Sequence, residues 1–125
     1  MENAKIKSFT DLNAWREGHK LVIQIYQITN NFPKEEIFSL TNQLKRAAVS
    51  TTSNIAEGFS RQSFKEKTQF YSIARGSVTE IQNQLLIAKD IKYLTADQFN
   101  KAAEQTVIVH KLINGLIKYL RSHNT

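Results

Sequence analysis

Six basic side chains lie close together in the middle of the sequence, and such a group of cations can bind phosphate. They are Lys45, Arg46, Arg61, Lys65, Lys67 and Arg75. The same stretch has only two acidic residues, Glu57 and Glu66, so six positive charges against two negative ones leave a net charge of +4. Arginine and lysine bind the phosphates of nucleic acids by charge and hydrogen bonding, without reading the bases. The stretch therefore predicts a nucleic-acid-binding surface.

Two aromatic residues, Phe59 and Phe64, lie among these cations. Aromatic rings can stack on unpaired bases, which would suit a surface that binds single-stranded RNA. Packing of both rings against the end of a domain is the simpler alternative.

The whole chain has a formal net charge of +6, which favours nucleic acid or acidic proteins as partners but is also ordinary for a small domain. It has no cysteine, which excludes disulfides, thiolate catalysis and cysteine zinc sites. No apolar run approaches the roughly 20 residues of a membrane span, and the first residues lack the apolar stretch of a signal peptide. We therefore expect a soluble, cytoplasmic protein.

Patterns for catalysis or metal binding are weak. A di-iron centre in a helix bundle uses a glutamate followed three residues later by a histidine, and no glutamate here has that neighbour. His19 and His110 fall near apolar stripes, where a lone histidine is usually a half-buried structural residue. Neither a phosphate-binding glycine loop nor a nucleophile elbow is present. We expect no enzyme activity, no catalytic residue, no metal and no cofactor.

The spacing of apolar residues predicts four long helices that would position the cations. The first covers about residues 11–31, with an expected core stripe of Leu12, Trp15, His19, Val22, Tyr26 and Thr29. The second starts near Pro33, which suits a first helical turn, and Gly58 is expected to end it in the left-handed conformation. Capping patterns at Ser63 and at Thr95 predict the starts of the third and fourth helices.

Short connections between long helices require antiparallel neighbours, so the fold class is all-α, an antiparallel up-down-up-down four-helix bundle. We expect a flexible N-terminus over residues 1–8 and a bundle domain over residues 9–122. A second row of cations, Lys111, Lys118 and Arg121, lies on the fourth helix, where a solvated face is the default interpretation.

Small residues interrupt the second and third helices. Ala47–Asn54 contains four hydroxyl residues, and Gly76 lies inside the third helix, where it costs about 1 kcal/mol relative to alanine. We expect the two stretches to face each other in a close crossing, with Glu57 able to pair with Arg75 across it. Binding of phosphate by Arg61 and Arg75 is the functional alternative.

Apolar residues also lie outside the expected core stripes, which suggests contacts between subunits of a homo-oligomer. These residues are Ile23, Ile73, Ile87, Val107 and Ile117.

Three segments of the sequence resemble the bacterial four-helix-bundle family encoded in intervening sequences of large-subunit ribosomal RNA genes. They are "FTDLNAWREGHKLVIQIYQITNNFPKEE", "LTNQLKRAAVSTTSNIAEGFSR" and "YSIARGSVTEIQNQLLIAKDIKYL". The same family includes relatives similar to the accessory variability determinant of diversity-generating retroelements. The resemblance implies a bundle that assembles as a ring, a pentamer, with a basic surface that contacts RNA. The residues that match the family's structural signature are Asn54, Glu57, Gly58, Arg61, Arg75, Gly76, Ser77 and Glu80.

We therefore expect a non-enzymatic, oligomeric protein that associates with ribosomal or retroelement RNA or with an RNA–protein complex. The alternative is a protein-interaction scaffold whose partner is acidic or is itself bound to nucleic acid, such as a reverse transcriptase. True phosphate contacts make the logarithm of the affinity fall linearly with the logarithm of the salt concentration, at about 0.7 per contact for a single strand.

Overall fold

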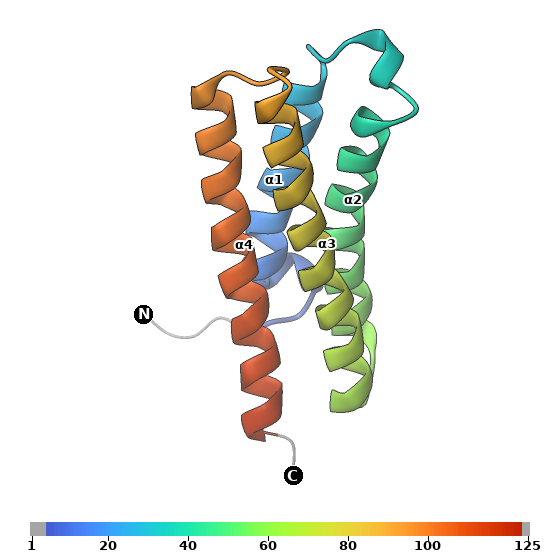
Figure 1. The fold of residues 1–125 in the computed structure, drawn as a ribbon. Coiled ribbons are helices and arrows are strands. Elements are labelled where there is room, and N and C mark those ends of the chain that lie inside the picture. Colours follow the sequence, from blue (N-terminus) through green and yellow to red (C-terminus); the bar gives the residue numbers. More distant parts are fainter. Residues whose placement is uncertain (1–4, 124–125) are drawn as a thin grey trace.

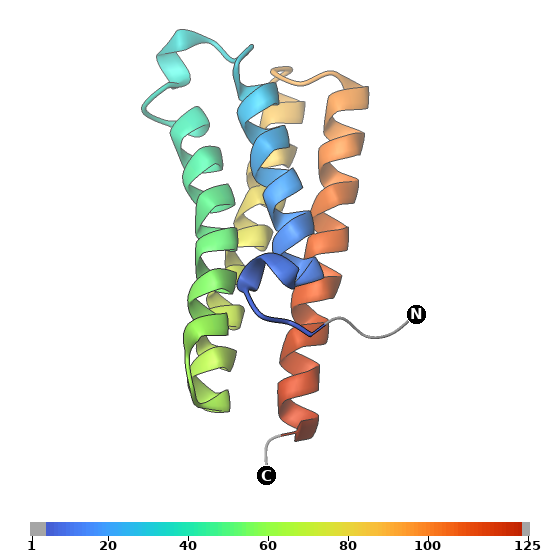
Figure 2. The ribbon, with the colours of Figure 1, turned by 180° about the vertical axis from the view of Figure 1, so that it is seen from behind.

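The computed structural model describes residues 5–123, and it is all-α. Its elements are η1 (Phe9–Asp11), α1 (Asn13–Thr29), η2 (Lys34–Glu36), α2 (Leu40–Ser60), α3 (Phe64–Asp90) and α4 (Ala96–His123). The four α-helices run alternately up and down (Figures 1 and 2). Each helix packs closely against its neighbours in the sequence, α1 packs also against α4, and no backbones of the diagonal pairs approach as closely within the described chain. The predicted up-down-up-down bundle is confirmed.

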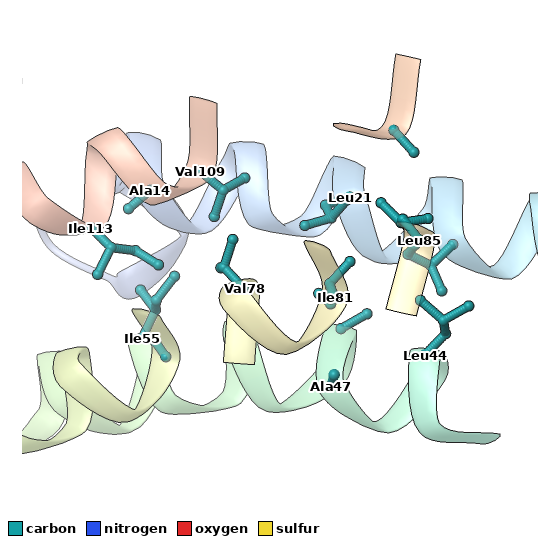
Figure 3. Close-up of a cluster of buried hydrophobic side chains, with 14 of the residues drawn as sticks. Ala14, Leu21, Leu44, Ala47, Ile55, Val78, Ile81, Leu85, Val109 and Ile113 are labelled. Atoms are coloured by element: carbon teal, nitrogen blue, oxygen red, sulfur yellow. The ribbon is translucent and has the colours of Figure 1, made fainter. Parts of the chain in front are cut away.

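One continuous apolar core fills the space between the four helices (Figure 3). Leu21, Leu44, Ile81 and Ile113 come from α1, α2, α3 and α4 in turn, and each is fully buried. Each such side chain contributes about 1.5–3 kcal/mol relative to an exposed one. The core therefore fixes which face of every helix points inward, and so which faces remain for binding.

The predicted core stripe of α1 is wrong by about one residue except at Thr29, which is buried as predicted. The buried positions are Ala14, Gly18, Leu21, Ile25, Ile28 and Thr29. Trp15 and Val22 are half-buried at the edge of the core, and Tyr26 is 42% exposed. A shift of one residue is a rotation of about 100° on a helix. Alanine and glycine are inside because α1 approaches α2 closely: a Cβ on Gly18 would lie 3.1 Å from the Thr52 methyl group.

The start of α2 also differs from the prediction, which placed it near Pro33. Pro33 instead precedes the short helix η2, and α2 begins at Leu40. The Glu36 carboxylate accepts hydrogen bonds from the Ser39 hydroxyl and, at 3.2 Å, from the Leu40 amide, so it caps the first turn of α2. The sequence analysis placed Pro33 in this first turn, but it lies seven residues before Leu40.

Gly58 does not end α2 in the left-handed conformation. The helix continues to Ser60, and no glycine in the described part of the chain has a positive φ. Gly58 is buried against α3, where an added Cβ would lie 2.7 Å from Cε1 of Tyr71. Its lack of a side chain therefore serves helix packing.

The predicted caps of α3 and α4 are confirmed. The Ser63 hydroxyl accepts a hydrogen bond from the Glu66 amide at 3.1 Å. Thr95 and Gln98 bond reciprocally: each side-chain oxygen accepts from the other residue's amide, at 3.1 and 3.0 Å. Such bonds satisfy amides that a helix start leaves unpaired.

The close crossing of α2 and α3 is present, but Gly76 takes no part in it. Ala47 and Thr51 of α2 are buried there, and the hydroxyl groups of Ser50 and Ser77 lie 2.9 Å apart. Gly76 is exposed, and a Cβ added to it would have no neighbour within 4 Å. The expectation for Gly76 is therefore wrong, because it lies on the outward face of α3.

The ion pair considered between Glu57 and Arg75 does not form. Glu57 binds Arg61 on its own helix at 2.7 Å, whereas Arg75 donates to Asn114 of α4 at 2.8 Å. Arg75 lies on the side of α3 that faces α4, whereas Glu57 belongs to α2 and pairs within its own helix.

At the N-terminus, residues 1–4 of the segment expected to be flexible lie outside the described residues. The backbone amides of Lys7 and Ser8 donate to the Asp11 carboxylate at 2.9 and 3.1 Å, which ties this part of the chain to η1. From residue 5 to residue 123, no helix combines the length and the apolarity that crossing a membrane requires.

Candidate nucleic-acid interface

The connection between α2 and α3 and the C-terminal end of α4 lie at the same end of the bundle (Figure 1, lower end). The antiparallel order of the helices brings these segments together although they are far apart in the sequence. We call this end of the molecule the basic end, because both segments carry cations.

A groove between α3 and α4 opens at the basic end, with a volume of about 480 Å³. Its lining residues are Phe64, Lys65, Thr68, Gln69, Ile117, Leu120 and Arg121. Ile117 and Leu120 are buried and form the apolar floor, whereas Lys65 and Arg121 are exposed. The arrangement offers a cation on each wall of an open groove, with an aromatic ring beside one of them.

Arg61 lies at the basic end, where α2 ends, but already has partners. Its guanidinium binds the Glu57 carboxylate at 2.7 Å and lies over the ring of Phe70, 4.6 Å from the centroid. The carboxylate offsets its charge, so Arg61 offers a phosphate less attraction than Lys65 does.

Lys67 is turned inward at the same end. Its ammonium group donates to the backbone carbonyls of Phe59 at 2.7 Å and Gly58 at 3.4 Å, and it lies 5.4 Å from the centroid of the Phe59 ring. Burial lowers the pKa of Lys67. These contacts satisfy carbonyls at the end of α2, which is a structural role.

Lys45 and Arg46 lie in the first half of α2, away from the basic end. Fifteen residues separate Arg46 from Arg61, which is about 22 Å along a helix. Lys45 lies over the ring of Tyr26, 4.7 Å from the centroid, and Arg46 lines a shallow groove between α2 and α3 that also contains Glu80. The six predicted cations therefore do not form one surface.

Arg75 lies halfway along α3 on the side that faces α4. Its guanidinium donates to the Asn114 side-chain oxygen at 2.8 Å, and the Asn114 amide nitrogen lies 3.2 Å from Nδ1 of His110. No carboxylate within residues 5–123 forms an ion pair with Arg75. The positive charge of this half-buried side chain is therefore held only by a neutral amide.

Arg121 lines the groove, although the sequence interpretation did not include it among the binding cations. Lys111, Lys118 and Arg121 were expected to lie on a solvated face of the fourth helix, and all three are exposed. The available signal was that no acidic residue follows Glu104 in the sequence. The sequence alone did not show that this end of α4 lies beside the start of α3.

Two other residues of the family signature, Asn54 and Ser77, form polar contacts within the bundle. Asn54 donates to the Ser50 backbone carbonyl at 2.8 Å and to its hydroxyl at 3.1 Å, and Ser77 lies 2.9 Å from the same hydroxyl. This chain of polar contacts links α2 to α3 at a point where both helices carry small side chains. It specifies their register by satisfying part-buried groups.

Across residues 5–123, no three histidine, aspartate or glutamate side chains are grouped so that they could hold a metal ion. The exposed cations Lys65 and Arg121 at the basic end have the chemistry to bind anions.

A search of the curated proteins found no match. Among solved structures, the fold is similar to a protein of unknown function from the S23 ribosomal protein family of Bacteroides thetaiotaomicron. The TM-score is 0.77 at 20% identity, and the match covers 84% of this chain and 95% of the other. The model of the 23S rRNA-intervening sequence proteins matches residues 10–115. With its four-helix bundle and a match over most of its length, the chain belongs to the 23S rRNA-intervening sequence protein family.

Proposed function

We propose that this protein is a non-enzymatic RNA-associated protein and that the basic end is its RNA-contacting surface. The observation that carries the proposal is the groove in which Lys65 of α3 and Arg121 of α4 lie on opposite walls. Both side chains are exposed, and neither forms an ion pair within the described residues. Exposed cations release counterions from a nucleic acid when they bind its phosphates, and this release drives association.

Charge reversal at the groove tests the proposal. Affinity for a fluorescently labelled RNA is measured by anisotropy over a series of salt concentrations, for the unmodified chain and for Lys65→Glu with Arg121→Glu. The matched control is Lys34→Glu with Lys101→Glu, which changes the net charge equally at exposed positions away from the groove. Two lost phosphate contacts should weaken binding at least roughly tenfold and lower the salt slope by about 1.4, at about 0.7 per contact for a single strand.

If the unmodified protein binds no RNA at low salt, the proposed function is wrong. An equal loss in both double variants would show that net charge matters and the groove does not. The alternative scaffold function, with an acidic or nucleic-acid-bound partner such as a reverse transcriptase, would gain support if the unmodified protein binds no RNA at low salt.

We also propose that the protein self-associates through the outward face of α3. Ile73 and Ile87 are 52% and 44% exposed on that helix, and the exposed Gly76 lies between them. A glycine inside a helix costs about 1 kcal/mol, and no contact within the chain uses the space it leaves. Close approach by a second copy would use that space. The sequence pattern placed Ile117 outside the core stripes, and this expectation is wrong: its side chain is 3% exposed and belongs to the core.

The mass of the protein in solution, measured by light scattering during size-exclusion chromatography, tests self-association. A mass of 14.4 kDa at all concentrations would contradict it. A ring of five copies is what the family resemblance implies, and the measured mass would show the number of subunits directly.

A further inference from the structure

We infer that the RNA bound by this protein is single-stranded and that its backbone follows the groove between α3 and α4 from the basic end up to Arg75. This inference rests on the proposed function, and it adds the type of RNA, the path of the strand and a third phosphate contact. The juxtaposition that carries it is a continuous line of cationic and neutral polar side chains on the two facing helices.

On α3, this line begins at Lys65 and continues through Thr68 and Ser72 to Arg75. These positions are three or four residues apart, so they lie along one side of the helix. Thr68 lines the groove at the basic end and Arg75 contacts α4, so this side of α3 faces α4. The line rises about 15 Å along the helix axis from its first residue to its last.

On α4, the matching line contains His110, Asn114, Lys118 and Arg121, again three or four residues apart. Asn114 bonds Arg75, and Arg121 lines the groove, so these two members of the line face α3. The nearest acidic residue along α4 is Glu104, about 9 Å beyond His110 along the axis. Over the lower half of the bundle, the neighbouring sides of α3 and α4 therefore carry cations, hydroxyls and amides that a strand leaving the groove would meet.

Arg75 is the feature that extends the binding path beyond the basic end. Its guanidinium has five N–H donors, and the Asn114 oxygen accepts from one of its nitrogens. Because Asn114 is in turn held by His110, the guanidinium is fixed in place before any ligand binds. A phosphate can accept from the other donors and supply the negative charge that the site lacks.

The shape of the surface favours a single strand over a duplex. Adjacent packed helices lie about 8–10 Å apart, so the groove between them is narrow and follows one line. Proteins that bind single strands use such cationic grooves with an aromatic side chain for stacking. Phe64 lines the lower end of the groove, and its half-buried ring also packs against the core, as the simpler alternative predicted. Duplex RNA is instead bound by shape across a broad surface that spans successive grooves of its helix.

Binding of an unstructured, labelled single-stranded oligonucleotide and of a duplex of the same length tests the inference. Anisotropy is measured over a salt series for the unmodified chain, for Arg75→Gln and for Lys101→Gln, a matched exposed control. We expect tighter binding of the single strand. Arg75→Gln should weaken it by roughly tenfold and lower the salt slope by about 0.7, while Lys101→Gln changes neither by much.

Arg75→Lys separates a phosphate contact from a role in packing. Lysine keeps the charge but not the forked geometry, so it should restore most of the salt slope even if the bond to Asn114 is lost. Thermal unfolding followed by circular dichroism shows whether each variant is folded at the temperature of the binding assay.

Two results would overturn the inference while leaving the proposed function intact. One is a preference for the duplex. The other is an Arg75→Gln variant that binds like the unmodified chain although Lys65→Glu with Arg121→Glu does not bind. No RNA binding by the unmodified protein would overturn both proposals together.

Discussion

Gly58 of α2 lies against the ring of Tyr71 of α3, so closely that a methyl group added to the glycine would lie 2.7 Å from Cε1 and 2.9 Å from Cδ1. Tyr71 is 4% exposed, so its ring has little room to move. This contact sets the distance between the two helices just before the chain turns from one to the other. The contact also distinguishes Gly58 from the other glycine of the family signature, Gly76, which has no such neighbour.

Gly58→Ala and Gly76→Ala should change stability in opposite directions. Alanine at position 58 gains about 1 kcal/mol of helix propensity but overpacks a buried contact at a cost of up to about 3 kcal/mol, so we expect a net loss near 2 kcal/mol. Alanine at position 76 meets nothing within 4 Å and should stabilise a monomer by up to about 1 kcal/mol. Urea unfolding measures both; equal effects would contradict the packing described for Gly58.

Substitution of Lys67 should lower stability more than substitution of Lys65, whereas substitution of Lys65 should weaken RNA binding more. Lys67→Gln removes a charged donor from the carbonyls of Phe59 and Gly58 and should cost about 1–2 kcal/mol. Lys65→Gln should leave the free energy of unfolding within about 0.5 kcal/mol, because its side chain is exposed. RNA affinity should show the reverse order. A stability loss at Lys65 with none at Lys67 would sink this assignment.

The stability of the bundle should fall in acid in part through Glu36. Its carboxylate accepts from the Ser39 hydroxyl, from the Tyr93 hydroxyl at 2.9 Å and from the Leu40 amide, and these bonds lower its pKa below the ordinary 4.5. A lowered folded-state pKa gives stability above that ordinary value, and it is lost as the pH falls through the folded pKa.

Glu36→Gln should therefore destabilise the protein at about pH 7, and the difference from the unmodified chain should shrink towards about pH 3. Urea unfolding at the two pH values measures this difference, with the exposed Glu104→Gln as control. The same bond to Glu36 raises the pKa of Tyr93, so its contribution is present below the ordinary tyrosine value of 10.0 and declines as the pH rises above it. A difference that does not depend on pH would argue against this role of Glu36.

Self-association should depend on Ile73 and Gly76. Ile73→Lys places a charge on the outward face of α3 without touching the core, because the side chain is 52% exposed. We expect it to lower the mass in solution towards 14.4 kDa while the melting temperature of the monomer stays similar. Gly76→Ala should act in the same direction by filling the space needed for close approach. Ile108→Lys, exposed on α4, is the matched control.

The helices and their caps could be predicted because they depend on residues close in the sequence. Ser63 with Glu66, and Thr95 with Gln98, bond within a single turn, so their spacing is enough to identify a helix start. Four amphipathic stretches with short connections allow few arrangements, and the antiparallel bundle followed from them.

Tertiary packing decided the rest, because it places side chains relative to residues far away in the sequence. A periodic pattern alone could not distinguish the face of α1 that contains Ala14 and Gly18 from its neighbour, since closeness to α2 selects small residues there. Equally, the sequence determined that cations are plentiful, but only the fold decided their use. It turned Lys67 inward onto backbone carbonyls and brought Lys65 and Arg121 together across one groove.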